Sequence, residues 1–204
     1  MARYPQHGAR EFSRAVRVCR WLVAAWLFAI APTSFADQHS AARAGAELPD
    51  AVKGTWQVEA VRVDLATTRT LHYQRDDPHL LGTRITIGDT RIETSTPEAR
   101  ECLLPKALVW KSTAAQFLAA TMAAHGDPAT PATLKSYELP LAEDAPVSVL
   151  WISCQSGRFG PRASAAARHA VGADDIGTWI LVLPSGQLAV RWFDETILLL
   201  HQSK

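Results

Sequence analysis

The sequence predicts a mainly β protein, an antiparallel β-barrel or sandwich of about seven or eight short strands with one α-helix near residues 112–124. Two observations lead to this prediction. Short apolar runs bounded by turn residues recur along the chain after residue 54. Only one stretch has sustained helical periodicity. The strongest strand pattern is in the closing stretch, residues 177–201.

This closing stretch is expected to form three strands joined by two tight turns. Two-residue turns at Ser185-Gly186 and at Asp194-Glu195 both place one apolar set on a single face, because side chains alternate with period two. We expect that face to line the barrel, and the opposite face, which is also apolar, to be covered by a helix, a loop or a partner. The set expected on the inner face is Trp179, Leu181, Leu183, Leu188, Val190, Trp192, Ile197 and Leu199.

Earlier strands are predicted from the same alternation. The first strand opens at Gly54 and changes phase near Val61, which indicates a β-bulge. A hairpin is expected over residues 83–94, with Gly88-Asp89 at its turn. Further strands are expected at residues 70–74, 135–139 and 147–154.

The helix is predicted over residues 112–124. Thr113 and Gln116 have the spacing of a capping box, and Gly126 with Pro128 ends the periodic stretch. Phe117, Leu118, Thr121 and Met122 form its apolar stripe. We expect this helix to cover the outer apolar face of the closing strands.

Residues 1–36 are predicted to be a secretory signal peptide cleaved after Ala36. Five arginines precede an apolar run that starts at Trp21, and Ser34-Phe35-Ala36 supplies small residues at the cleavage site. The run is shorter than the roughly 20 residues of a membrane span, although an uncleaved anchor is the alternative. No membrane span is therefore expected after cleavage.

Two segments are expected after the signal peptide. Residues 37–53 are Ala-rich and polar, which is typical of a flexible leader. Residues 54–204 have the length of one barrel-like domain.

Composition indicates the compartment and excludes some partners. Arg outnumbers Lys and Ala is abundant, as in proteins from GC-rich bacterial genomes, so we expect a bacterial periplasmic or secreted protein. The chain has 21 basic and 20 acidic residues. Five of the arginines and only one acid fall in the signal peptide, so the mature chain is slightly acidic. This balance disfavours a nucleic acid or an anionic membrane as partner.

Cys102 and Cys154 are the two cysteines that remain after signal cleavage. In an oxidising compartment two such cysteines usually pair, so a Cys102–Cys154 disulfide is predicted. Two separate buried thiols are the alternative. There is no CxxC motif, so neither a redox site nor a metal site is expected at these positions.

The triplet Gly54-Thr55-Trp56 at the first strand resembles the opening of lipocalin-like (calycin) barrels. In that family the tryptophan closes one end of the barrel, and an arginine from a late strand often packs across it. The resemblance implies that Arg191 has this second role and that the barrel binds a ligand.

The tryptophans are the candidates for lining such a cavity. Trp56, Trp151, Trp179 and Trp192, with Arg191, are predicted to line an apolar ligand cavity. The alternative is that these side chains simply fill a core.

Residues 155–176 lack apolar periodicity and are predicted to be a long loop. Arg158, Phe159 and Arg162 would place an aromatic between cations, a pattern suited to a partner's cleft. Small periplasmic hydrolase inhibitors use similar barrels, so the loop is a candidate for inhibiting a secreted or periplasmic hydrolase. A mobile loop with no partner is the alternative.

Catalytic and metal motifs do not stand out. The sequence has no nucleophile elbow, no HExxH and no phosphate loop, so an enzyme is not favoured, although an unrecognised hydrolase remains open. His72, Asp76, Asp77 and His79 are metal-ligand types, but Asp-Asp-Pro also forms turns, and a solvated turn is favoured. No metal and no cofactor are expected.

The sequence therefore predicts a secreted or periplasmic, non-enzymatic binding protein for a small apolar ligand. The alternative is an inhibitor or interaction protein that acts through the loop at residues 155–176.

Overall fold

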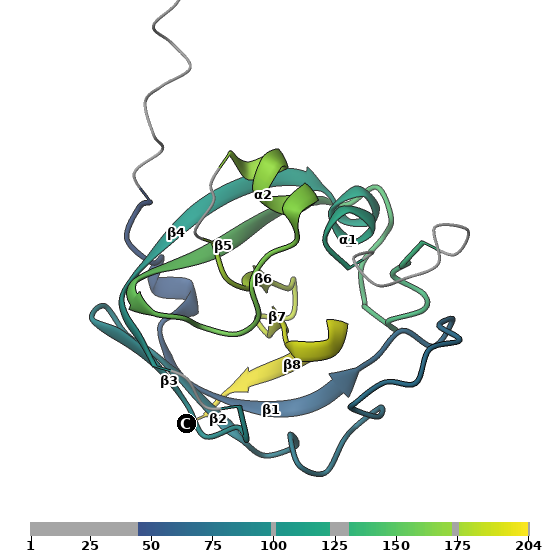
Figure 1. Ribbon diagram of the computed structural model, residues 1–204, viewed down its shortest axis with the longest axis horizontal. Coiled ribbons are helices and arrows are strands. Elements are labelled where there is room, and N and C mark those ends of the chain that lie inside the picture. Colours follow the sequence, from purple (N-terminus) through teal and green to yellow (C-terminus); the bar gives the residue numbers. More distant parts are fainter. Residues whose placement is uncertain (1–44, 99–100, 123–130, 173–175, 204) are drawn as a thin grey trace, which may run out of the picture. The chain divides into compact units, whose positions relative to one another are not determined.

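The computed structural model describes residues 45–98, 101–122, 131–172 and 176–203. Eight antiparallel strands pair in chain order, and the last pairs with the first, so that one sheet closes into a barrel (Figure 1). The mainly β class is therefore confirmed, as a barrel. The elements are η1 (Asp50–Val52), β1 (Gly54–Arg62), β2 (Arg84–Ile87), β3 (Arg91–Thr94), β4 (Cys102–Thr113), α1 (Ala114–Met122), β5 (Pro146–Gly157), α2 (Ala165–Val171), β6 (Trp179–Val182), β7 (Leu188–Arg191), η2 (Phe193–Glu195) and β8 (Ile197–Gln202).

Several predicted elements are confirmed, and others are wrong. The bulge in β1 and the β2–β3 hairpin are present, but the hairpin turns at Asp89 and Thr90 instead of Gly88-Asp89, since Ile87 pairs with Ile92. Residues 70–74 and 135–139 form turns and loops instead of strands, and the twelve-residue strand β4 was not anticipated. The segment 155–176 is not a plain loop, because it contains the end of β5 and the helix α2.

The closing meander β6–β7–β8 is present, but its predicted register is wrong by one residue at each turn. Ile180 pairs with Val190, and Val190 pairs with Leu198. Both connections contain three residues: Leu183 pairs with Gln187 around the first, and Trp192 pairs with Thr196 around the second. One extra residue per turn moves every β7 side chain to the opposite face relative to β6 and β8.

The apolar residues of the barrel form two layers. The first layer, called the barrel interior, receives side chains from all eight strands, so it lies inside the closed sheet. Trp56, Ile85 and Val190 are typical members, each at most 2% exposed. The second layer, called the outer layer, lies between the sheet and the two helices and includes Trp151, Trp179 and Leu199.

A helix, α1, is present near residues 112–124, as predicted, and it covers the outer layer, but the face assignment of β6 and β8 is reversed. Trp179, Leu181 and Leu199, expected to line the barrel, lie under the helix, whereas Ile180 and Leu198 point into the barrel interior.

Helix α1 begins directly after β4, where Thr113 Oγ1 accepts the Gln116 N–H at 3.4 Å. Phe117 packs edge-on against Trp179, with ring centroids 4.6 Å apart. In Figure 1 α2 is drawn over β4 and β5 with α1 beside them, and the two helices contact each other. Residues 123 and 124 of the predicted helix lie outside the described residues.

Helix α2 has a capped start and a glycine end. Ser164 Oγ accepts the Ala167 N–H at 3.1 Å, and Gly172 closes the helix in the left-handed conformation, with φ 71°. Ala167 and Val171 are buried in the outer layer. These two contacts explain why a segment with weak apolar periodicity still becomes helical.

Residues 45–53, expected to belong to a flexible leader, are packed against the barrel. Ala46 exchanges two backbone hydrogen bonds with Ala107 of β4, at 2.9 and 2.8 Å. Leu48 and Val52 are buried in the barrel interior. Trp56 Nε1 donates to the Val52 carbonyl at 2.9 Å, so η1 lies against the predicted barrel-closing tryptophan.

The predicted disulfide is confirmed. Cys102 and Cys154 are bonded, with their Cα atoms 5.3 Å apart. Cys102 lies at the short junction where β4 pairs with both β3 and β5. The bond therefore holds the two long strands together beside the least extensive strand pairing of the barrel.

Candidate functional site

The predicted cavity residues do not share one cavity wall. Trp56 and Trp192 lie in the barrel interior, whereas Trp151 and Trp179 lie in the outer layer. All four are at most 2% exposed. Arg191 alternates with Val190, an interior residue, so it projects on the side away from Trp56. The expected packing of an arginine across the barrel tryptophan is therefore not present.

Aromatic and aliphatic side chains fill the barrel interior around Trp192. The Trp192 ring lies 5.9 Å from the Phe159 ring and 5.4 Å from the Phe193 ring, both in edge-on contact. Its Nε1 donates to Glu98 Oε2 at 3.2 Å. Phe159, expected to project toward a partner, is 0% exposed and instead closes this end of the core.

An apolar groove of about 390 Å³ lies where β5 begins and β6 ends. Because the two strands are antiparallel neighbours, these two ends lie at the same end of the barrel. Residues from η1 and from the loop before β5 complete the walls. The lining residues are Pro49, Val52, Leu141, Ala145, Pro146, Val147, Ser148, Leu150, Leu181, Val182, Leu183 and Pro184.

The groove connects the two apolar layers. Val52 and Leu150 belong to the barrel interior, whereas Leu181 and Val147 belong to the outer layer. Ser148 is the one lining residue with a polar side chain. The lining comes from three segments far apart in the sequence, so only the fold brings them together. Three of the lining residues are prolines near the ends of elements. These prolines are the one feature of the sequence that could have indicated the groove.

Arg191 is the centre of a buried polar cluster instead of a ligand cavity. It is 5% exposed, and its Nη1 donates to the Arg162 carbonyl at 3.0 Å. Burial lowers the pKa of Arg191, and the nearby Glu195 and Tyr137 act in the opposite direction. The Tyr137 hydroxyl donates to the Glu195 carbonyl at 2.9 Å, and burial raises the pKa of Tyr137. The cluster joins β7, η2 and two loops.

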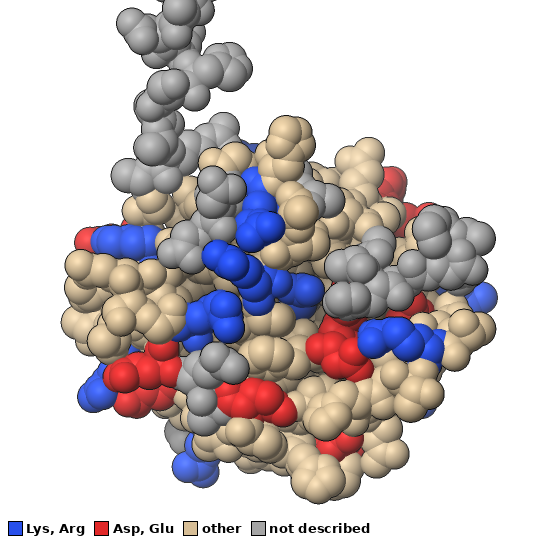
Figure 2. Space-filling view, viewed as in Figure 1, with Lys and Arg blue, Asp and Glu red and all other residues tan. Residues whose placement is uncertain are grey.

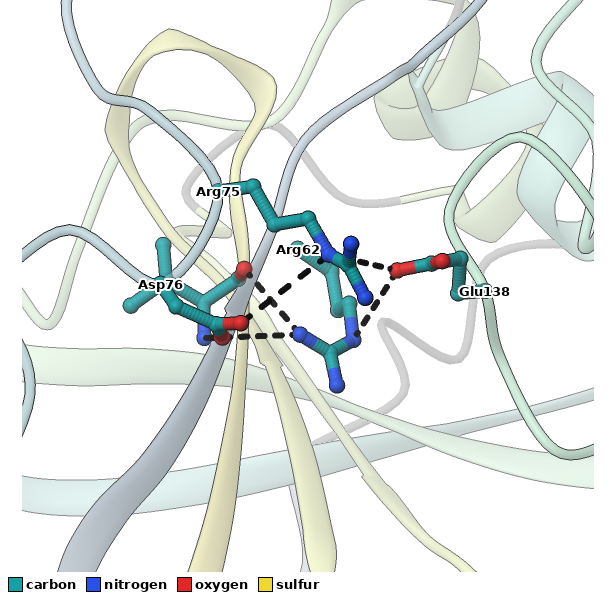
Figure 3. A network of polar contacts seen from close by, with 5 residues as sticks. Arg62, Arg75, Asp76 and Glu138 are labelled. Carbon is teal, nitrogen blue, oxygen red and sulfur yellow. Dashed lines mark hydrogen bonds and ion pairs between the residues drawn. The ribbon is translucent and has the colours of Figure 1, made fainter.

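A network of ion pairs joins the end of β1, the loop that follows it and the loop before β5 (Figure 3). Arg62 Nη1 lies 2.8 Å from Asp76 Oδ1, and Arg75 Nε lies 2.8 Å from Glu138 Oε2. Arg62 Nε also approaches Glu138 Oε2, at 3.8 Å. Asp76 accepts the Val61 backbone N–H at 3.0 Å. Each acid serves two arginines, so the network is balanced by its own residues and acts as a structural clamp.

The four residues considered for a metal take part in turns. Asp77 accepts the His79 backbone N–H at 2.9 Å and lies 3.0 Å from the His79 ring nitrogen. The His72 backbone N–H donates to Asp194, while Asp76 belongs to the ion-pair network. In the parts of the chain that the structure describes, there is no group of three or more His, Cys, Asp or Glu arranged to hold a metal ion.

Comparison with known proteins gives no match for this chain. No protein-family model matches the chain, and no match was found among curated proteins or solved structures. Within the described ranges, no helix is long and apolar enough to cross a membrane. The class that the fold and the groove define is a closed eight-stranded antiparallel barrel, cross-linked by one disulfide, with an apolar groove at one end.

Proposed function

We propose that the chain is a secreted or periplasmic, non-enzymatic binding protein that takes a small apolar ligand in the groove between β5, β6 and η1. The groove itself carries the proposal. Its volume of about 390 Å³ falls within the range of ligand sites, roughly 300–1,000 Å³. Its lining is apolar except for Ser148, which suits a ligand with few polar groups.

The fully buried tryptophans favour the groove over the barrel centre as the binding site. Trp151, Trp179 and Trp192 are among the largest fully buried side chains, which fits a core role. A ligand in the groove would contact side chains held by regular strand pairing, such as Leu150 and Leu181. The closed eight-stranded ring and the Gly54-x-Trp56 opening support a likeness to lipocalin-like barrels.

The proposed location outside the cytoplasm rests on two features. The Cys102–Cys154 disulfide suits an oxidising compartment. Residues 1–36 have the composition of a signal peptide and lie outside the described residues. Export and cleavage after Ala36 would be tested by N-terminal sequencing of the protein recovered from a bacterial periplasm.

A filled-groove variant tests the ligand site. Ser148→Trp places a large side chain in the groove, and Ser156→Trp is the control, because Ser156 is an exposed serine on the same strand that does not line the groove. We expect saturable binding of an environment-sensitive apolar dye by the unmodified protein and the control. Ser148→Trp should weaken it at least about tenfold, since the apolar surface that the dye would bury is already occupied. Equal binding by all three proteins would refute the groove as the site.

A further inference from the structure

Three arginines lie together in a part of the chain without acidic residues. From Gln155 to Gly172 the sequence contains Arg158, Arg162 and Arg168 but no Asp or Glu. None of the three makes an ion pair with a described residue. Figure 2 shows Lys and Arg side chains gathered on the face beside α2, where this segment runs in Figure 1.

Several arginines elsewhere in the barrel do have carboxylate partners. Arg62 and Arg75 share Asp76 and Glu138, and Arg69 lies 2.7 Å from Asp194. Lys53 and Arg91 also pair with carboxylates. Among the exposed arginines of the described residues, only Arg84 outside this segment lacks such a partner, and it stands alone, so the group of three arginines beside α2 is a distinct feature.

A fourth arginine, Arg191, is buried beneath this group. Arg191 Nη1 donates to the carbonyl of Arg162 at 3.0 Å, so its buried guanidinium lies directly under the exposed segment. The aliphatic stem of Arg158 lies beside Gly177, since a Cβ there would be 3.5 Å from Arg158 Cγ. Thr178 Oγ1 donates in turn to the Arg191 carbonyl. Segment 176–178 therefore contacts both Arg158 and Arg191.

The backbone that carries these arginines is held in place. Gly157 has φ 76°, and a Cβ there would lie 1.9 Å from the Glu101 carbonyl oxygen, so only glycine fits. The Arg158 N–H donates to the same carbonyl at 3.0 Å. Phe159, buried against Trp192, anchors the next residue in the barrel interior. The arginines are thus presented by a fixed loop, which lowers the entropy cost of binding a ligand.

Two of these guanidinium groups also have an Nε donor that no described residue accepts. The Nε atoms of Arg158 and Arg191 are buried without a hydrogen-bond partner among the described residues. A buried cationic group with unmet donors is costly, and a nearby anion lowers that cost. Arg191 already has the Glu195 carboxylate nearby, so the uncompensated positive charge of the segment is that of Arg158, Arg162 and Arg168. An anion with two negative charges matches this charge better than a single carboxylate. Guanidinium forks also fit the oxygen pairs of a phosphoryl group.

We propose that Arg158, Arg162 and Arg168, supported from below by Arg191, form a binding site for a phosphoryl group carrying two negative charges. This site is separate from the apolar groove, and the inference does not depend on the proposed apolar ligand. The group could come from a soluble phosphate compound or from the headgroup of a lipid, and both share the same recognition chemistry.

The test uses calorimetric titration of the full chain with inorganic phosphate at constant ionic strength. We expect saturable binding that weakens about tenfold in Arg158→Gln and in Arg162→Gln, because each loses one charge-assisted contact. Arg162→Lys keeps the positive charge but loses the forked pair of guanidinium donors, so phosphate binding should weaken less than in Arg162→Gln. Arg84→Gln is the matched control, because Arg84 is exposed on β2 and makes no ion pair with a described residue. Thermal unfolding of each variant without phosphate verifies that it is folded.

Vesicles distinguish the two sources of the phosphoryl group. Retention on phosphatidylcholine vesicles that contain phosphatidic acid, but not on pure phosphatidylcholine, would support the site and assign it to a lipid headgroup. Phosphate binding without vesicle retention would support the site and assign it to a soluble compound. If the protein shows neither phosphate binding nor vesicle retention, the proposal is overturned. Acetate binding as tight as phosphate, or equal binding by the two glutamine variants and the control, would also overturn it.

Discussion

Removal of the Cys102–Cys154 disulfide should lower the stability of the barrel by about 4 kcal/mol. The two cysteines are 52 residues apart in sequence, and the bond closes a loop that contains β4, α1 and β5. In the chain-entropy treatment, a loop of this length reduces the entropy of the unfolded chain by an amount worth about 4 kcal/mol at 25 °C. The reference for this figure is the unfolded chain, so native packing need not change.

The structure indicates which part of the barrel should open first when the disulfide is absent. Among the described residues, β3 and β4 pair through Arg91 with Leu103 and Ile92 with Cys102, and the Leu104 N–H donates to the Thr90 carbonyl at 2.7 Å. Ile92 and Cys102 are both 0% exposed, so this junction is apolar and buried. Without the cross-link, opening at the β3–β4 junction should become easier than opening elsewhere, because so few strand pairs hold it.

Urea unfolding of the protein and of a Cys102→Ala/Cys154→Ala variant measures the effect. We expect the midpoint to fall by an amount equivalent to about 4 kcal/mol, with amide exchange accelerated most at β3 and at the start of β4. The single variant Cys154→Ala, which leaves Cys102 as a buried thiol, should lose a similar amount. A change below about 1 kcal/mol in both variants would refute this reasoning.

Three further predictions concern packing and pH. Phe117→Ala on α1 and Phe159→Ala in the barrel interior should each cost about 3–5 kcal/mol in thermal or urea unfolding, since both rings are at most 1% exposed; a cost below about 1 kcal/mol would contradict the assigned packing. Burial raises the pKa of Tyr137, so at alkaline pH the tyrosine ionises only in the unfolded chain, and the stability of the protein should fall as the pH rises above about 10. Tyr137→Phe should reduce this loss of stability with pH. An unchanged alkaline slope in the variant would contradict the prediction. For Asp77, burial alone would raise the pKa, but hydrogen bonds from His79 and Gln74 outweigh burial and lower the pKa. The folded protein should therefore lose stability as the pH falls below about 4. If Asp77→Asn unfolds with the same acid profile as the unmodified protein, this prediction is wrong.

The sequence predicted the parts of the fold that local chemistry determines. Thr113 and Gln116 marked the start of α1, and the two cysteines after the predicted signal peptide marked the disulfide. The phase change in the first strand marked the β-bulge in β1. Each of these depends on a few neighbouring residues or on a single pairing choice.

The register of the closing strands could not be predicted, because both faces of these strands are apolar. Leu181 and Ile180 are equally buried, one under the helices and the other inside the barrel. A shift of one residue therefore does not expose any hydrophobic side chain, and hydrophobic pattern alone does not select the register. The turn geometry decides it, with Asp194 and Glu195 in the left-handed conformation at φ 54° and 56°.

The same ambiguity affected the predicted sites. Trp179 and Trp192 were placed on one face by the two-residue turns, whereas the three-residue turns separate them. Phe159 has polar and glycine neighbours in sequence, yet long-range contacts bury it against Trp192. The groove depends on the meeting of three distant segments, which no local pattern in one sequence reveals.

Native mass spectrometry of the protein purified from a periplasm without detergent tests the central claim most directly. Binding in the groove predicts a population that carries one small apolar molecule per chain. Ser148→Trp, which fills the groove, should lose this population, and Ser156→Trp should keep it. A protein that is always empty, even after exposure to a mixture of lipids, would contradict the claim, as would a bound molecule that Ser148→Trp fails to displace.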